Sequence, residues 1–191
     1  MRLFVAVEID AALARELVRA AGELRRRVEA RAPRARVTWV AADRLHFTVR
    51  FIGEVDDDRV PAIVAALAAP LPLAPFDLTI ADLGAFPLKG PPRAFWAGIS
   101  QGKTEMSSLE HAVSARLASC GIGADLRAYS PHLTLARVRE AGGLRTRETL
   151  DAAPHGPFGT TRIDAITLFE SRLSPKGPTY VPVQRTPLRA G

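Results

Sequence analysis

The sequence of 191 residues has little of several residue types, and each shortage excludes a class of protein. Its single cysteine, Cys120, excludes an intramolecular disulfide and fits a reducing compartment. No apolar run approaches the roughly 18 residues that a membrane-spanning helix needs. The apolar stretch at residues 3–9 includes Glu8 and follows only one basic residue, Arg2, so it makes a poor signal peptide. Together these shortages predict a soluble, cytoplasmic protein.

Lysine is also scarce, although the chain is basic. Only three of the 26 Lys and Arg residues are lysine, which leaves 26 − 3 = 23 arginines, and the formal net charge is +6. The planar guanidinium of arginine suits phosphate and nucleic acid. A GC-rich coding sequence would give any protein the same richness in alanine, arginine and proline. The charge therefore permits an anionic substrate without identifying one.

The pattern of apolar residues predicts interspersed strands and helices in one domain that covers residues 1–191, made of two closely packed lobes. We expect helices at about residues 11–30, 59–69 and 106–119, and one helical turn near residues 146–150. Hairpin-like pairs of strands favour antiparallel sheets, and therefore an α+β fold. The strands are expected at residues 3–9, 37–40, 45–52, 76–83, 94–99, 132–139, 161–170 and 179–184.

Two segments share the pattern apolar–His–apolar–Thr–apolar. The first contains His46 and Thr48, and the second contains His132 and Thr134. Side chains two apart on a strand lie on the same face, about 7 Å apart, so each segment would present an imidazole beside a hydroxyl. With 4 histidines and 12 threonines in 191 residues, chance gives about 4 × 12/191 ≈ 0.25 His-x-Thr matches. Two matches, 132 − 46 = 86 residues apart, indicate an internal duplication that brings like strands together across a groove.

A pair of histidines suits the hydrolysis of a cyclic phosphodiester. An unperturbed imidazole has a pKa near about 6.5, so at neutral pH one ring can be a base and the other an acid. The base would deprotonate the attacking water, and the acid would protonate the departing ribose oxygen on the opposite side of phosphorus. Thr48 and Thr134 could donate hydrogen bonds to the non-bridging oxygens. No cofactor is needed for these steps.

A metal site is the competing explanation for the histidines. Zinc sites built from histidine usually have a third protein ligand and close spacing such as His-x-x-x-His. The other two histidines, His111 and His155, lie in a predicted helix and a polar loop, with no cysteine or carboxylate at ligand spacing. We therefore expect no metal ligand among these residues.

The sequence resembles the two-histidine phosphoesterase superfamily, specifically the bacterial RNA 2',3'-cyclic phosphodiesterases, also called 2'-5' RNA ligases. The resemblance runs through nearly the whole chain. It is carried by residues 2–8, Trp39, residues 46–53, 84–87, 92–93, Trp96, residues 129–137 and 171–173, Gly177 and Tyr180.

The resemblance implies two antiparallel sheets that form a central groove, related by a pseudo-two-fold axis, with helices packed outside. It implies that His46 is the proton donor and His132 the proton acceptor, and that Thr48, Thr134 and Arg137 bind the phosphate. The implied reaction opens RNA or nucleoside 2',3'-cyclic phosphates to 2'-phosphomonoesters. We expect this reaction to need no metal, and we expect a monomer by default. The implied partners are RNA 3' ends, and some relatives also join 2'-5' linkages.

Further residues are weaker candidates for contact with the substrate. On an ideal strand, Arg50 would lie on the same face as His46. Arg137 would lie on the face opposite to His132, so it needs a bend or bulge to reach the groove. Lys89 and Arg93 lie in a loop that could form the basic edge of the groove. Phe86 or Tyr129 could stack on a terminal base. By contrast, Phe47, Phe51, Trp39 and Trp96 are expected in the core.

Two other functions remain open from the sequence. The groove could bind terminal phosphates of RNA without turning them over. Alternatively, the same chemistry could act on an ADP-ribose cyclic phosphate or on 2'-5' oligonucleotides, because the predicted site recognises the cyclic phosphate more than the base.

Overall fold

The computed structural model describes residues 1–125, 128–151, 153–174 and 177–190. Nine strands in these residues form one antiparallel sheet. They are β1 (Arg2–Glu8), β2 (Arg36–Trp39), β3 (His46–Glu54), β4 (Phe76–Phe86), β5 (Ala94–Gln101), β6 (Leu133–Glu140), β7 (Gly159–Ile163), β8 (Ala165–Arg172) and β9 (Thr179–Pro187). The α+β class is confirmed, but the expectation of two separate sheets is wrong.

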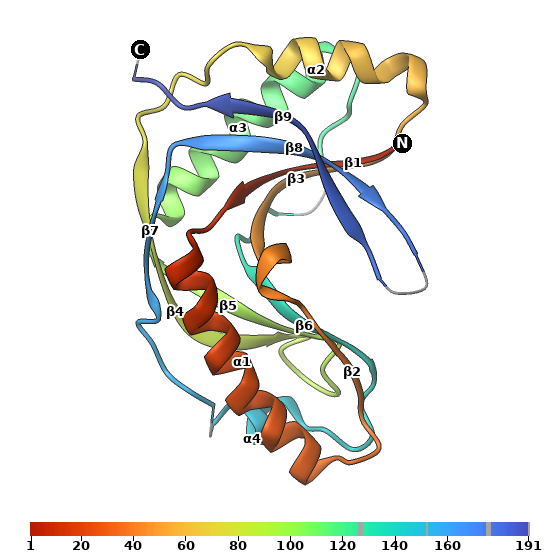
Figure 1. Cartoon of the computed structure of the whole chain (residues 1–191), viewed down its shortest axis with the longest axis vertical. Coiled ribbons are helices and arrows are strands. Elements are labelled where there is room, and N and C mark those ends of the chain that lie inside the picture. Colours follow the sequence, from red (N-terminus) through yellow and green to blue (C-terminus); the bar gives the residue numbers. More distant parts are fainter. Residues whose placement is uncertain (126–127, 152, 175–176, 191) are drawn as a thin grey trace.

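The strand order β7-β4-β5-β6-β3-β1-β8-β9 explains both the single sheet and its groove. The two motif strands, β3 and β6, lie at the centre and have three strands beyond each of them. They pair through only one register position, Phe47 with Leu133, after which β2 takes the place of β3 beside β6. The sheet is therefore continuous, but its two halves diverge where the His-x-Thr segments begin (Figure 1).

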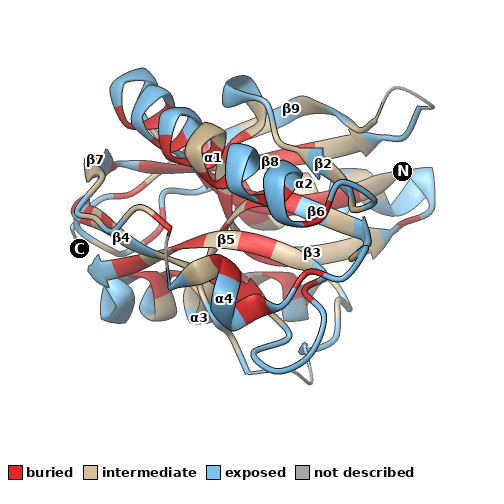
Figure 2. Ribbon diagram, turned by 90° about the horizontal axis from the view of Figure 1, so that it is seen from below, coloured by how far each residue is buried: buried red, intermediate tan, exposed pale blue. Residues whose placement is uncertain are grey.

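The helices are α1 (Ala11–Arg31), α2 (Val60–Ala68), α3 (Lys103–Ser119) and α4 (Thr146–Leu150), with short 3-10 turns at Ala42–Arg44 and Asp57–Arg59. Asp10 begins α1, because its side chain accepts a hydrogen bond from the backbone N–H of Leu13 at 2.8 Å. Every third or fourth residue of α1 faces inward, so the helix has one buried stripe and an exposed outer face (Figure 2). No helix in the described part of the chain is long and apolar enough to cross a membrane.

Each long helix packs across the centre of the sheet. Leu24 and Val28 of α1, which follows β1, lie in one buried cluster with Phe95 of β5 and Ala136 of β6. In turn α3, which follows β5, contacts β3 and α2. A larger core cluster contains residues from both halves, including Leu3 of β1 and Leu78 of β4. The helix of each half thus covers strands of the other half.

Most element boundaries differ from the predictions by one to three residues, and three of the differences have a clear structural basis. The strand expected at residues 161–170 is two strands, because Asp164 separates β7 from β8. The strand expected at residues 76–83 continues to Phe86, since the small residues Gly84 and Ala85 pair with Trp96 and Phe95 of β5. The helix expected from residue 106 begins at Lys103, after Gly102 adopts a left-handed backbone with φ 93°. The helical turn expected near residues 146–150 is present, and residue 152 beyond it lies outside the described part of the chain.

Candidate active site

One cleft of about 350 Å³ lies where β3 and β6 diverge, and both His-x-Thr segments line it. His46 and Thr48 come from β3, Thr134 comes from β6, and His132 immediately precedes β6. Phe47 and Leu133, between each His and Thr, have no exposed surface and anchor the two segments in the core. The remaining lining residues are Arg2, Phe4, Val40, Arg44, Phe51, Arg137, Ser171, Leu173, Pro178 and Tyr180.

The two histidines make the same backbone contact. Nδ1 of His46 lies 2.8 Å from the carbonyl oxygen of Arg44, and Nδ1 of His132 lies 2.8 Å from that of Ser130. Each partner is therefore two residues before its histidine. A carbonyl oxygen only accepts hydrogen bonds, so Nδ1 donates and Nε2 remains the nitrogen that can exchange a proton with a ligand.

Aromatic rings hold each imidazole in place. The His46 ring lies 5.1 Å from Phe4 and 5.2 Å from Tyr180, with Tyr180 edge-on. The His132 ring lies 5.0 Å from Phe86, also edge-on, and 6.4 Å from Trp96. Packing of this kind restricts the orientation of both rings before a substrate binds.

Two matching β-bulges decide which later residues reach the cleft. In β3, Val49 and Arg50 are both buried, and the pairing with β1 is shifted beside them. In β6, Leu135 and Ala136 are both buried, and the pairing with β5 is shifted at the same place. An extra residue in a strand moves each later side chain to the opposite face of the sheet. Phe51 and Arg137, the equivalent residues that follow the bulges, consequently line the cleft.

The bulge that Arg137 needs in order to face His132 is present, and Arg137 lies in the cleft with the histidines. The expectation for Arg50 is wrong for the same reason. Its side chain is 6% exposed, hydrogen-bonds to the carbonyl of Gly123 and lies 3.8 Å from the carboxylate of Asp125, away from the cleft. The core assignment of Phe51 is also wrong, because this ring is 48% exposed at the cleft.

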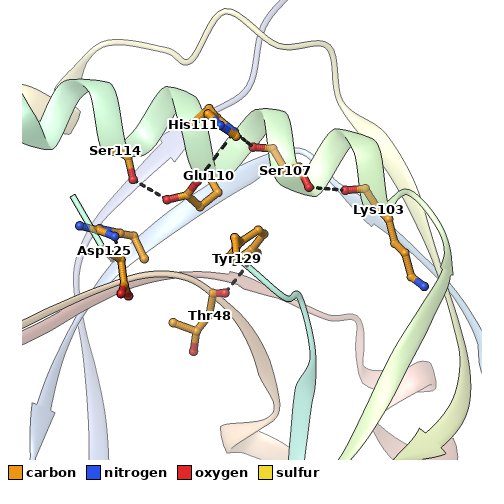
Figure 3. Close-up of polar contacts among 9 residues, drawn as sticks. Thr48, Lys103, Ser107, Glu110, His111, Ser114, Asp125 and Tyr129 are labelled. Carbon is orange, nitrogen blue, oxygen red and sulfur yellow. Dashed lines mark hydrogen bonds and ion pairs between the residues drawn. The ribbon is translucent and has the colours of Figure 1, made fainter. Parts of the chain in front are cut away.

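The other weaker candidates do not line the cleft. Tyr129 is packed under α3 against the core, and its hydroxyl donates to the carbonyl oxygen of Thr48 at 3.2 Å (Figure 3). This contact ties the segment before His132 to the opposite motif strand, and burial raises the pKa of the Tyr129 hydroxyl. Phe86 supports His132 from behind, while Lys89 and Arg93 are exposed outside the cleft.

Arg2 and Arg44 also line the cleft, although neither is among the site residues predicted from the sequence. The guanidinium of Arg2 lies over the Phe51 ring, 5.2 Å from its centroid, and Arg44 donates to the carbonyl of Pro178 at 3.2 Å. Arg44 lies two residues before His46, and its carbonyl holds the ring of that histidine. Arg2 lies within residues 2–8, which carry the family resemblance, but no pattern in the sequence assigns a role to Arg2 or to Arg44.

The electrostatic environment of the cleft is positive. Arg2, Arg44 and Arg137 line it, and none of its lining residues in the described chain is aspartate or glutamate. Burial lowers the pKa of the His46 imidazole, and the charge of Arg137 lowers it further, while the carbonyl of Arg44 and the carboxylate of Glu8 act in the opposite direction. The imidazolium form of His46 is therefore less favoured than that of an unperturbed histidine.

No group of three or more His, Cys, Asp or Glu side chains that could hold a metal ion occurs in the described residues. His111 is an example, because its ring is exposed on α3 and contacts Ser107 and Glu110 of the same helix (Figure 3).

A curled antiparallel sheet with two His-x-Thr strands at one basic cleft defines the class of two-histidine phosphoesterases. The profile of the LigT-like phosphoesterase family matches residues 12–96 and 99–180, and the chain belongs to this family. It is 29% identical over 180 residues to the RNA 2',3'-cyclic phosphodiesterase of Archaeoglobus fulgidus, covering 94% of this chain and 96% of that one.

Solved structures agree with this assignment. The TT0787 protein of Thermus thermophilus is 28% identical, with a TM-score of 0.81 over 100% of this chain and 99% of that one. Escherichia coli LigT, solved as a complex with 3'-AMP, is 25% identical, with a TM-score of 0.75 over 98% of this chain and 97% of that one.

Proposed function

We propose that this protein hydrolyses RNA or nucleoside 2',3'-cyclic phosphates to 2'-phosphomonoesters by general acid and base catalysis with His46 and His132. The observation that carries the proposal is that both His-x-Thr segments meet in one cleft. Arginines line this cleft, and its described lining residues include no carboxylate. Such a cleft favours an anion, and its paired imidazoles supply the two proton transfers that opening a cyclic phosphodiester needs. The substrate class follows from the RNA 2',3'-cyclic phosphodiesterases to which the chain is similar.

In the proposed reaction, water attacks phosphorus in line with the bond to the ribose 3'-oxygen. Nε2 of His132 takes a proton from the water as the new P–O bond forms. Nε2 of His46 gives its proton to the 3'-oxygen as the old P–O bond breaks. The products are a 2'-phosphomonoester and a free 3'-hydroxyl, and the protonation states of the two rings are exchanged.

The hydroxyls of Thr48 and Thr134 donate to the non-bridging oxygens, which gain negative charge in the transition state. Arg137 adds a positive charge on the same face of β6. Since the cleft already holds these donors on packed strands, little reorganisation accompanies the reaction. No metal ion has a part in this scheme.

The lowered pKa of His46 makes its role as proton donor dependent on the substrate. Arg137 disfavours the imidazolium in the free protein. A cyclic phosphate carries a negative charge, and its arrival beside Arg137 and His46 favours protonation of the ring. Substrate binding should therefore shift His46 toward its charged, proton-donating form.

Substitution of the histidines tests the enzyme assignment. His46→Ala and His132→Ala should each lower kcat by about 10²- to 10⁴-fold on a nucleoside 2',3'-cyclic phosphate. The double variant should lose far less than the product of the two losses, because the residues act as a unit. Activity should persist in EDTA. Cyclic phosphate that binds but stays intact from pH 5 to 8 would instead establish a binding module.

A sulfur leaving group tests which histidine is the acid. A substrate with sulfur in place of the 3'-oxygen expels a thiolate, which needs no proton at neutral pH. His46→Ala should then regain most of its lost rate, whereas His132→Ala should stay slow because the water still needs a base. Recovery by His132→Ala alone would reverse the two roles.

A further inference from the structure

Glu8, the last residue of β1, lies directly beside His46. The two residues are opposite each other in the antiparallel pair of β1 and β3. Opposite side chains of such a pair lie on the same face, with Cβ atoms about 4.5–5.5 Å apart. The hydroxyl of Thr167 in β8, a residue that is 4% exposed, donates to Oε2 of Glu8 at 2.9 Å. Two strands therefore hold this carboxylate next to the imidazole.

His46 borders two cavities, and Glu8 lines the one that the phosphate does not enter. The second cavity measures about 510 Å³ and lies between the end of β1, the start of α1, the turn before β3, and strands β8 and β9. Both Glu8 and His46 line it, whereas His46 without Glu8 lines the cleft. A carboxylate inside the cleft would repel an anionic substrate. In the second cavity it acts on the imidazole from outside the phosphate site.

The charged groups around His46 act in opposite directions. The titratable side chains near it on the cleft side are Arg44, His132, Arg137 and Tyr180. Those in the second cavity are Glu8, Arg15 and Asp43. Burial lowers the pKa of His46 most and Arg137 lowers it further, whereas the carbonyl of Arg44 and the carboxylate of Glu8 raise it. Glu8 is thus the charged side chain that offsets Arg137.

A glycine takes the equivalent place beside the other histidine. Strand β5 flanks β6 in one half as β1 flanks β3 in the other, and the pairing of β5 with β6 ends at Ala97 and Leu133. Continuing that register by one residue places Gly98 beside His132, where β1 has Glu8. The chain therefore supplies a carboxylate to one imidazole at this position and no side chain to the other.

We propose that Glu8, held by Thr167, is a positioning residue that makes His46 the proton donor of the pair. This inference rests on the proposed function, in which one imidazole must be protonated and the other neutral when the reaction begins. The carboxylate favours the imidazolium at His46, and the glycine leaves His132 without that support. After His46 has given its proton to the 3'-oxygen, the same charge favours its reprotonation from solvent.

The pH profile of kcat on adenosine 2',3'-cyclic phosphate tests this role. A proton donor loses activity as the pH rises through its pKa, so His46 sets the basic limb of the profile. Glu8→Gln should move this limb to lower pH and lower kcat above it by roughly 2- to 5-fold, the size expected for one exposed ion pair. The acidic limb, which His132 sets, should stay in place. KM should not rise, because Glu8 does not line the cleft.

The substrate with sulfur in place of the 3'-oxygen separates this role from a structural one. Its thiolate leaves without a proton, so Glu8→Gln should match the wild type on it at every pH. Glu8→Asp should keep most of the wild-type profile on the oxygen substrate, because it retains the charge. Thr167→Val, which removes the hydroxyl that holds the carboxylate, should move the basic limb in the same direction as Glu8→Gln but by less.

A matched control is Asp77→Asn, which removes a carboxylate from β4 that pairs with Arg162 outside both cavities. Its profile should equal that of the wild type. A basic limb that stays in place in Glu8→Gln, or an equal loss on the oxygen and sulfur substrates, overturns the role of Glu8 and leaves the proposed function intact. A wild-type protein that turns over neither substrate would remove the proposed function itself.

Discussion

At the scale of single residues, Arg137 affects the chemistry of the site before any substrate is present. Burial is the larger of two influences that lower the pKa of the His46 imidazole, and the guanidinium of Arg137 is the other. The carboxylate of Glu8 partly opposes both. Because the folded protein holds this pKa below the ordinary value of about 6.5, the unfolded chain binds more protons in the interval between the two values. Stability associated with His46 is therefore lost as the pH falls through that interval.

Arg137→Gln should raise the pKa of His46 in the free protein, because the substitution removes a nearby positive charge and keeps a polar side chain. An NMR titration of the His46 ring measures this directly. Glu8→Gln is the opposite control and should lower the same pKa, since the Glu8 carboxylate favours the imidazolium. Shifts of both variants in the same direction would contradict this account of the electrostatics.

At the scale of elements, the packing of β4 on β5 controls the support behind His132. Gly84 of β4 faces Trp96 of β5, and a Cβ on Gly84 would come within 2.1 Å of the indole ring. Trp96 in turn lies against His132 and pairs in register with Thr134. A methyl group at residue 84 would thus displace the ring that backs one motif segment.

Gly84→Ala should destabilise the protein by about 1–3 kcal/mol, the usual cost of overpacking, and should also lower kcat. Gly22→Ala offers a matched control on α1, where the nearest atom to a new Cβ would be in the Arg26 side chain at 4.0 Å. It should stabilise the protein by about 1 kcal/mol, as alanine does in a helix. Urea unfolding and kcat measured on both variants check the pair. A Gly84→Ala protein as stable and active as the wild type would contradict the packing argument.

The same elements show how far the sequence alone could predict the fold and the site. Strict alternation in residues 45–49 and 132–135 predicted the two motif strands, because a half-buried strand requires that pattern. Beyond residue 49 the prediction failed for Arg50 and Phe51, because a bulge is a feature of pairing with β1 and leaves no local sign. The union of both halves in one sheet depends on the single pair Phe47 and Leu133, which periodicity cannot reveal.

At the scale of the whole molecule, the exchange of helices between the halves binds the two motif strands into one unit. Leu24 and Val28 follow β1 in the chain yet pack on Phe95 and Ala136 at the opposite half. The main core cluster likewise joins β1 and β3 to β4 and β6. Neither half can lose its packing without exposing the apolar face of the other, so we expect the sheet to unfold in a single cooperative transition.

Leu24→Ala tests this coupling, because Leu24 has no exposed surface and its truncation should cost about 2–5 kcal/mol. Amide hydrogen exchange can follow Val5 in β1 and Ala97 in β5, one strand from each half. If the halves form one unit, the most protected amides of both strands should lose the same protection free energy, since each exchanges through global unfolding. A loss confined to β5, with β1 unchanged, would show that the halves unfold separately. The geometry of the shared cleft would then depend on local packing in each half, and not on the interlocked core.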